Sequence, residues 1–338
     1  MNLAMTDIST LPSVQPDDLE LYRRELTGYC YRMLGSGSEA EDAVQETMIR
    51  AWGKAGGFEG RSSLKSWLYR IATNVCIDMQ RSVQRRARPM DLGPASPPDE
   101  QYLRPQRLDL PWVTPIADAK VASASELSDP AEVAEFRESI RLAFVTALQH
   151  LPARQRAALI LCEVLHWPAA EAAALLEMTV AAINSALQRA RATLRQLDSH
   201  PQKPPALDPD SASVIAAYVE AFESYNIDRL VSLLAHDAIQ SMPPYELWLQ
   251  GADNIGRWMV EPGPLACKGS RMLPLPSGTV NGCPAFGQYR RDPAGGYHAW
   301  AIHVIEVSGG KVTDLNLFLA EMDPERLFAR FGLPPRLD

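Results

Sequence analysis

The chain has 338 residues, a hydrophobic content of 46% and a formal net charge of −8 at pH 7. This length predicts two or three domains, and the charge argues against a protein that coats nucleic acid through charge alone. No apolar run reaches the roughly 18–20 residues of a membrane span, and the N-terminus lacks the pattern of a secretory signal. We therefore expect a soluble cytoplasmic protein without a membrane partner.

The five cysteines are scattered along the chain and form no CxxC pair. A disulfide framework or a zinc site requires paired spacings, so buried free thiols are expected. The sequence accordingly predicts no metal site and no cofactor.

The first predicted block, residues 17–88, is helical. Ser38 followed by Glu41 is typical of a capping box and predicts a helix that begins there. Apolar spacing predicts a buried face made of Ala43, Val44, Thr47, Met48, Ala51 and Trp52. The opposite face carries Asp42, Gln45, Glu46 and Arg50.

A second helix is predicted from Leu64 through the basic stretch RSVQRRAR. One exposed face aligns Asn74, Asp78, Arg81 and Arg85, with Arg86 and Arg88 extending its basic end. Such a face could hold DNA through phosphates while reading bases, and the preceding loop GFEGRSS could hold a base flipped out of the stack. The alternative is a basic helix end favoured by the helix dipole, beside a plain loop.

Two proline-rich linkers divide the chain. Residues 89–130 contain more acidic than basic residues, and residues 200–210 form a shorter linker. The first linker includes Leu110, Trp112 and Val113, which are more apolar than a free tether requires. Three blocks result, at residues 17–88, 131–198 and 211–333.

The second block predicts a helix-turn-helix. A short helix over 169–177 is followed by a break at Met178 and Thr179 and by a longer helix from Val180. A recognition helix needs short polar side chains and arginines near its N-terminal half. The longer helix exposes Asn184, Ser185, Gln188, Arg189 and Arg191, and it is expected to bury Ile183, Leu187 and Leu194. An ordinary helical hairpin with a solvated face is the alternative.

The third block changes from helices to strands. SVIAAYVEAFESYN and IDRLVSLLAHDA are predicted helices, and RMLPLP, PAFGQYRR, YHAWAIHVIEV and KVTDLNLFLA are predicted strands of a meandering antiparallel sheet, an α+β layout. Candidates for a general base are His236, Asp237, Asp253, His298 and His303. No second acid is obviously paired with any of them, so no catalytic residue is predicted and the chain is not expected to be an enzyme.

Four segments together resemble regions 2 and 4 of the extracytoplasmic-function (ECF) sigma factors of bacterial RNA polymerase. They are DAVQETMIRAW, WLYRIATNVCID with its basic tail, LPARQRAALIL and VAAINSALQRARATL. The resemblance covers residues 17–88 and 137–198 and implies two all-α sigma domains, the second a helix-turn-helix. It implies a factor that directs the polymerase core to −35 and −10 promoter elements and helps to melt them.

The family implies roles for the matching positions. Asp42, Gln45 and Glu46 match the face that binds the clamp of the largest polymerase subunit, and the flap of the second-largest subunit is the other expected contact. Contact with the −10 element is assigned to Phe58, Arg61, Ser62, Ser63, Asn74, Asp78, Arg81 and Arg85. Contact with the −35 element is assigned to Asn184, Ser185, Gln188 and Arg189.

The C-terminal block resembles a SnoaL-like domain of the ketosteroid-isomerase-like cone fold. The resemblance rests on YVEAFESYNIDRLVSLLAHDAIQSMPP, LWLQG and the last two predicted strands. It implies an α+β cone in which Met242, Tyr245 and Trp248 line or rim a pocket that faces a small ligand or the sigma domains. We expect this tail to be a built-in regulatory module that packs on the apolar residues of the first linker. An anti-sigma protein is a further candidate partner.

Two other classes of function stay open. A free-standing helix-turn-helix repressor with a ligand-binding tail would need neither the acidic face around Asp42 nor the arginine-rich helix end. An isomerase or cyclase of the cone fold would need a buried, paired carboxylate in the tail. A transcription assay that depends on core polymerase separates both from a sigma factor.

Overall fold

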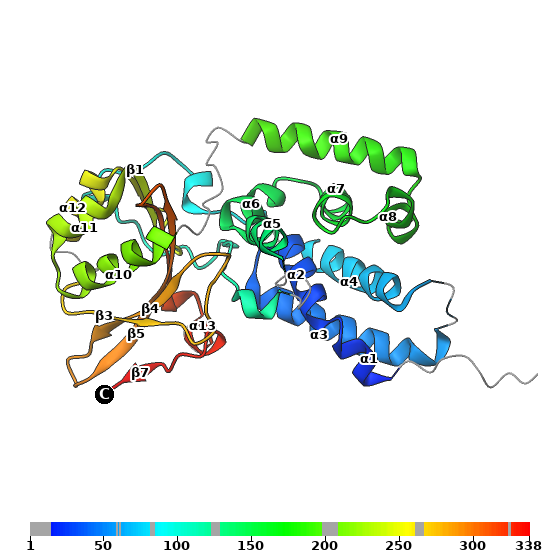
Figure 1. Ribbon diagram of the computed structural model, residues 1–338, viewed down its shortest axis with the longest axis horizontal. Helices are drawn as coiled ribbons and strands as arrows, with labels where there is room; N and C mark the ends of the chain where they lie inside the picture. Colours follow the sequence, from blue (N-terminus) through cyan, green and yellow to red (C-terminus); the bar gives the residue numbers. More distant parts are fainter. Residues whose placement is uncertain are drawn as a thin grey trace, which may run out of the picture. The chain divides into compact units, whose positions relative to one another are not determined.

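The computed structural model describes residues 15–58, 60, 62–81, 85–122, 129–197, 209–260, 267–323 and 326–338. These residues form two compact units. Figure 1 labels most of their helices and strands. Unit 1 contains the described residues up to Val83 together with His150–Leu197. Unit 2 contains those of Gln84–Gln149 and Asp198–Asp338. Segments far apart in the sequence therefore share a unit.

The N-terminal part of unit 1 is a helical bundle. It consists of α1 (Pro16–Glu20), α2 (Arg23–Leu34), α3 (Gly37–Lys54), the 3-10 turn η1 (Ala55–Gly57) and α4 (Leu64–Gln80). The N-cap of α3 is Ser36, whose hydroxyl accepts a hydrogen bond from the amide of Glu39, so the helix begins earlier than the predicted Ser38. Trp52, predicted in the buried face, is 54% exposed because Ala51, one 100° helical step before it, faces the core.

The predicted continuous basic helix is wrong. α4 ends at Gln80, and Arg85 begins an extended segment that belongs to unit 2. There Ala87 forms a parallel β-bridge with Trp112 of the linker. Arg86 is only 8% exposed and donates a hydrogen bond of 2.9 Å to the carbonyl of Trp112. Pairing with the linker therefore withdraws Arg86 from the solvent.

The C-terminal part of unit 1 contains the predicted helix-turn-helix. Its elements are α7 (Ala153–Leu159), the π-helical turn η5 (Ile160–Val164), α8 (Ala169–Leu176) and α9 (Val180–Leu197). α8 and α9 meet at 99° across a short turn, in which Glu177 has a φ of 54°. Ile183 and Leu187 are buried as predicted, and Leu194 is half-buried.

Among the described helices, none alone is long and apolar enough to span a membrane, and the bent pair α8–α9 passes that test only when both helices are taken together. The described cysteines are free, with Cys30, Cys76 and Cys283 buried and Cys162 and Cys267 partly buried. The expected free thiols are thus confirmed.

Unit 2 begins with the first linker and the helices that follow it. Its short elements are η2 (Pro89–Asp91), η3 (Glu100–Tyr102) and η4 (Asp118–Lys120), followed by α5 (Pro130–Ile140) and α6 (Leu142–Gln149). Leu103 packs against the hydrophobic core of the C-terminal domain. Trp112, Val113 and Ile116 are each no more than 4% exposed. The linker therefore contacts the tail through Leu103, whereas the predicted packing of Leu110, Trp112 and Val113 on the tail stays a prediction.

The C-terminal domain of unit 2 has the predicted α+β layout. Its elements are α10 (Pro209–Glu223), α11 (Ile227–Leu233), β1 (Leu234–Ser241), β2 (Trp248–Gln250), α12 (Ala252–Val260), β3 (Arg271–Pro274), β4 (Ala285–Arg291), β5 (Tyr297–Ser308), β6 (Lys311–Leu319), η6 (Ala320–Met322), α13 (Leu327–Arg330) and β7 (Arg336–Leu337). The sheet order is β2-β1-β6-β5-β4-β3, and β7 pairs with β5. α10, α11 and α12 cover one face of this sheet (Figure 1).

The antiparallel meander is confirmed for β3 to β6, but the sheet is mixed. The segment LAHDA, predicted as the end of a helix, is the first half of β1, which pairs parallel with β6 and antiparallel with β2. This pairing supplies the backbone hydrogen bonds that a helix would otherwise supply. Local periodicity did not predict several elements of this domain, among them β1, β2, β7, α12 and α13.

Candidate functional site

The acidic surface predicted on α3 is exposed. Asp42 and Gln45 face the solvent, and Glu46 is half-buried and forms an ion pair of 2.6 Å with an arginine one turn along. Two apolar side chains of the same helix are also exposed, Ile49 at 57% and Trp52 at 54%. The spacing of Asp42, Gln45, Ile49 and Trp52 places them on one side of the helix. The candidate face therefore combines polar and apolar side chains.

The polar face predicted on α4 is also exposed. Asn74, Asp78 and Arg81 follow one another at helical spacing, and Asp78 forms an ion pair of 3.2 Å with Arg81. Arg85 is exposed but lies in unit 2, so it does not extend this face as one helix.

The loop before α4 brings the other candidates to the start of that helix. The ring of Phe58 lies 5.0 Å from the ring of Trp67. Ser63 is the N-cap of α4 and accepts a hydrogen bond of 3.1 Å from the amide of Ser66. Ser62 is half-buried beside it. Arg61 lies outside the described residues, so its role stays a prediction.

The candidates on α9 share one solvent-exposed face, made of Asn184, Ser185, Gln188 and Arg189. Arg191 differs from them, because it forms an ion pair of 2.6 Å with Glu163 of η5. That ion pair holds Arg191 against the helix-turn-helix itself, which leaves Arg189 as the less restrained cation near the middle of α9.

Within unit 1, the helix-turn-helix half packs on the N-terminal bundle. Arg156 of α7 is 5% exposed, and its guanidinium donates to the carbonyl of Met33 in α2. Gln80 donates to the same carbonyl at 2.6 Å. Burial lowers the pKa of Arg156 to about 10. The rings of Tyr69 and Trp167 lie 5.0 Å apart and add an aromatic contact.

The stretch SMPPYELWLQG lies against the linker within unit 2. Met242 is 1% exposed and belongs to the domain core. The hydroxyl of Tyr245 accepts a hydrogen bond of 3.2 Å from Gln106, and the indole of Trp248 donates one of 2.9 Å to the carbonyl of Gly93. Two of the three candidate pocket residues thus hold the linker, and their role in lining a pocket stays a prediction.

Arg107 adds charge to the same contact. Its amide donates to the carbonyl of Pro244 at 2.8 Å, and its guanidinium forms an ion pair of 2.5 Å with Glu246. Asp109 accepts from the same guanidinium at 2.8 Å and holds its orientation. The linker is therefore bound to the tail through backbone, amide and charged groups together.

Asn281, in the loop between β3 and β4, binds both the linker and α5. Its amide oxygen accepts from the backbone of Ile116 at 3.0 Å, and its amide nitrogen donates to the carbonyl of Ile140 at 2.6 Å. Asn281 is fully buried and has a φ of 52°. At Gly282 a Cβ would lie 3.1 Å from the Cβ of Arg137, so the loop approaches α5 closely.

A buried ion pair joins the start of α6 to the sheet. Arg141 and Glu306 are 6% and 3% exposed, and the guanidinium donates to the carboxylate. Arg141 also reaches Glu138 at 3.3 Å. Removing one partner would leave a buried charge without compensation, so this pair makes the attachment of α5 and α6 to the tail specific.

The interior of the tail holds one buried histidine. His303 is fully buried, and its Nε2 lies 2.7 Å from the amide oxygen of Gln288. Burial lowers the pKa of His303 to about 3, so the ring is neutral near pH 7. Of the other candidates for a general base, His236, Asp237 and Asp253 are exposed and His298 is half-buried. Within the described residues, the polar partner of His303 is thus an amide and not a carboxylate.

Sequence reasoning missed the residues that join segments. Arg156, Arg141 and Asn281 stand in helix or turn patterns that are explained equally well by a solvated surface. The signals that could have found them are weak. One is an arginine inside the apolar run LPARQRAALIL, and the other is an Asn-Gly pair, which is typical of a two-residue turn and here forms the turn closed by Val280 and Cys283.

Family models match three parts of the chain. Residues 19–86 match "Sigma-70 region 2", residues 141–194 match "Sigma-70, region 4", and residues 215–315 match "SnoaL-like domain". The three matches follow the order of the predicted blocks.

Two relatives from Mycobacterium tuberculosis are similar over most of the chain. The ECF RNA polymerase sigma factor SigG is 41% identical over 328 residues, which cover 94% of this chain and 83% of SigG. The ECF RNA polymerase sigma factor SigJ is 27% identical over 321 residues, or 89% of this chain and 90% of SigJ. The crystal structure of SigJ matches with a TM-score of 0.57 at 21% identity, covering 95% of this chain and all of that one, and it supports the fold.

Proposed function

The chain belongs to the family of ECF sigma factors, which act with RNA polymerase in transcription initiation. We propose that its exposed helix faces and its tail have three separate functions. Region 2 binds the polymerase and opens the −10 element, region 4 reads the −35 element, and the SnoaL-like tail regulates both. The observation that carries this proposal is the exposure of separate polar faces on α3, α4 and α9.

The face of α3 binds the clamp of the largest polymerase subunit. Asp42 and Gln45 supply the polar groups, and Ile49 and Trp52 supply apolar area that would otherwise stay in water. Interfaces are enriched in aromatic residues at their centres, whereas charged residues at the rim steer association. The exposed Trp52 therefore supports a role in binding rather than in folding.

Region 2 contacts and helps to melt the −10 element. Asn74, Asp78 and Arg81 present hydrogen-bonding groups along α4, and Phe58 and Ser62 stand at its N-terminal end. Unstacked bases are held by aromatic side chains and by hydrogen bonds to their edges. Arg61 and Arg85 are proposed as phosphate contacts beside these groups.

Region 4 reads the −35 element with α9. Asn184, Gln188 and Arg189 can form bidentate hydrogen bonds with bases in the major groove, and Ser185 can contact a base or a phosphate. All four are exposed at the spacing of one helix face. This supports direct readout by a helix-turn-helix.

The tail acts through the linker and is not proposed to be an enzyme. Tyr245, Trp248 and Asn281 bind the chain that connects region 2 to region 4. Because the tail is covalently attached, weak contacts suffice to hold the linker and so to limit the placements open to region 4. Among the described residues, the bonded partner of the neutral His303 is the amide of Gln288 and not an acid, which argues against proton transfer at this site.

Transcription in vitro tests the main claim. Core polymerase, the full chain and genomic DNA are combined, and transcript 5′ ends are mapped by sequencing. We expect start sites that require the chain, and we expect Asp42→Lys/Trp52→Ala to lose core binding while Asp17→Asn, an exposed acid on α1, does not. Arg189→Ala should weaken initiation by roughly tenfold at the same sites. No start site that depends on the chain would overturn the proposal.

A second comparison tests the tail. Trp248→Phe/Arg107→Ala removes bonds to the linker but leaves α4 and α9 intact. We expect its initiation rate per bound polymerase to change by at least about threefold in either direction, because roughly 1 kcal/mol of linker binding is lost. An unchanged rate, with core affinity also unchanged, would contradict the regulatory role.

A further inference from the structure

Arg191 of α9 lies on the side of the helix that carries two of the proposed base readers. It follows Asn184 by seven residues and Gln188 by three, and these spacings place side chains on one side of a helix. Recognition helices read base edges with their N-terminal residues, whereas residues further along can contact the DNA backbone. Arg191 therefore stands where an arginine would bind a phosphate, and its charge does not depend on pH.

A carboxylate of the same folded unit already engages this arginine. Glu163, which precedes α8 in the sequence, accepts a hydrogen bond of 2.6 Å from the Nε of Arg191. The Nη2 of Arg191 lies 2.6 Å from the same carboxylate oxygen. Among the described residues, Arg189 has no such acidic partner. Arg191 is thus the cation of α9 that the protein itself neutralises.

The backbone that presents Glu163 is a π-helical turn. η5 continues α7, and the amide of Leu165 donates a hydrogen bond of 2.9 Å to the carbonyl of Ile160, five residues back. Ile160 and Leu161 are buried, whereas Glu163 is half-buried. A π-turn takes up one more residue than an α-helical turn, so it changes which side chains of the segment face α9. Such turns are rare and are frequently found at functional sites.

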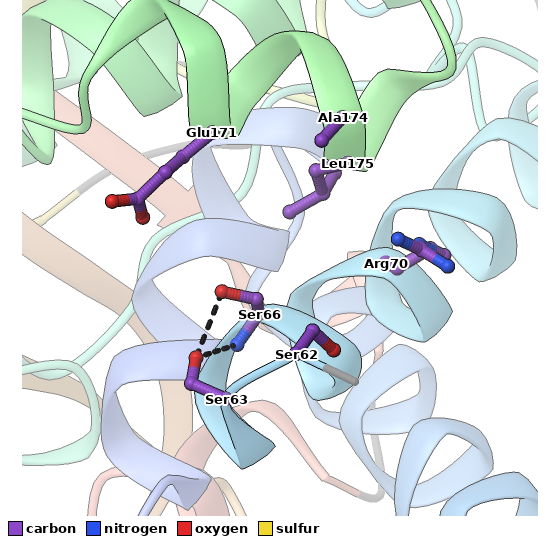
Figure 2. Close-up of a pocket in the computed structure, with 7 residues that line it drawn as sticks. All are labelled: Ser62, Ser63, Ser66, Arg70, Glu171, Ala174 and Leu175. Atoms are coloured by element: carbon purple, nitrogen blue, oxygen red, sulfur yellow. Dashed lines mark hydrogen bonds between the residues drawn. The ribbon is translucent and has the colours of Figure 1, made fainter. Parts of the chain in front are cut away.

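The other acidic residues of the helix-turn-helix half do not engage α9. Glu171 of α8 lines a pocket of about 300 Å³ together with Ser66 and Arg70 of α4 (Figure 2). Glu177 ends α8 and is exposed. Among the described residues, neither acid forms an ion pair with an arginine of α9. The contact with Arg191 is therefore specific to the position of Glu163.

The exposure of the pair shows where its effect lies. The side chains of Arg191 and Glu163 are 48% and 33% exposed, and exposed ion pairs add little to folding stability. A phosphate contact has a larger effect on DNA binding, because it raises the affinity for every sequence alike. A promoter is selected by the ratio of specific to non-specific affinity. An arginine that is kept from phosphates therefore improves that ratio.

We propose that Glu163 is a positioning residue that determines the specificity of region 4, because its carboxylate keeps the guanidinium of Arg191 from DNA phosphates. Binding by α9 then depends more on the base readers Asn184, Gln188 and Arg189. This inference rests on the proposed function, which assigns the −35 element to α9, and it adds a residue outside the reading helix.

The test measures binding of the full chain to a fluorescein-labelled DNA duplex of mixed sequence by fluorescence anisotropy, at salt concentrations from about 50 to 200 mM. Glu163→Gln should bind about threefold more tightly at the lowest salt, and its plot of log affinity against log salt should be steeper by about 0.9, the slope of one phosphate contact. Arg191→Gln alone should leave the slope unchanged, and Glu163→Gln/Arg191→Gln should return it to the wild-type value. A purely structural role of the pair would instead make Glu163→Gln bind more weakly.

A matched control and a second readout complete the experiment. Glu177→Gln removes the same charge from an exposed position without releasing an arginine, and it should keep the wild-type slope. With core polymerase, Glu163→Gln should lower by roughly threefold the ratio of transcription from a natural −35 element to transcription from a scrambled one. A wild-type slope in Glu163→Gln, or a steeper slope that persists in the double variant, would overturn the inference. In either case, chain-dependent start sites would show that the proposed function stands without it.

Discussion

The guanidinium of Arg156 is hydrogen-bonded to the carbonyl oxygen of Met33, although 123 residues separate them in the sequence. Met33 is the penultimate residue of α2, where the helix dipole is negative and carbonyls lack helical partners. A cation from region 4 thus completes a helix of region 2. This bond makes the two sigma regions one folded unit in the chain without polymerase.

Replacing Arg156 should loosen that unit. In Arg156→Met the apolar volume is largely kept, but a hydrogen bond from a charged donor worth about 2 kcal/mol is lost. We expect hydrogen exchange of the α7 and α8 amides to accelerate by up to roughly 30-fold. Arg154→Met, on the same helix but exposed, is the control and should leave exchange unchanged. Equal exchange in both variants would show that Arg156 does not hold region 4.

The pair Arg141–Glu306 should behave as a buried ion pair. Arg141→Met leaves the carboxylate of Glu306 buried alone and is expected to cost about 3–5 kcal/mol in the unfolding of unit 2, whereas Arg141→Met/Glu306→Met should recover much of that loss. Glu138→Gln removes the more exposed partner and should cost less than about 1 kcal/mol. Chemical denaturation monitored by circular dichroism compares them. A double variant as unstable as the single one would contradict this account.

Asn281 should contribute to stability in two separable ways, through its side-chain hydrogen bonds and through its left-handed backbone conformation. Asn281→Gly removes both side-chain hydrogen bonds but keeps easy access to the left-handed backbone, and we expect about 2 kcal/mol of lost stability. Asn281→Ala loses the same bonds and adds roughly 1 kcal/mol of backbone strain. Protease cleavage of the linker near Ile116 should accelerate in that order. If the two variants were cleaved equally fast, the backbone conformation would contribute nothing.

The buried His303 should make the protein less stable in mild acid. Its folded pKa is about 3, below the ordinary value of 6.5, so the unfolded chain takes up the proton first as the pH falls. Stability should therefore decrease from about pH 6.5 downwards, by about 2 kcal/mol at pH 5 for this residue. His303→Gln should remove that part of the pH dependence. Parallel wild-type and variant curves of Tm against pH would contradict the prediction.

Several elements were predictable because their signals are local. The break between α8 and α9, the exposure of Asn184 and Gln188, and the strands β3 to β6 follow from residue spacing over a few turns or pleats. Local spacing gave the wrong prediction where a partner distant in the sequence determines the structure of a segment. β1 is a strand because β6 and β2 bind its backbone, and Arg86 is buried because the linker runs beside it.

The candidate surfaces divide in the same way. The face of α3 was located by its acidic residues, but the exposure of Trp52 was not, since an aromatic residue at helical spacing indicates a core. SMPPYELWLQG indicated the wall of a cone, and the structure adds that Tyr245 and Trp248 hold the linker. The residue spacing within that stretch does not predict that Gln106 and Gly93 are its partners.

The sequence by itself determined the helical blocks, the helix-turn-helix, the α+β tail and the family, because periodicity, capping and turn residues act over a few positions. Only the tertiary structure decided which modules pair. Region 4 is attached to region 2 by Arg156, and its leading helices are attached to the tail by Arg141 and Asn281. These contacts join residues more than 100 positions apart, and their energy arises from burying charged and polar groups together, which no local pattern records.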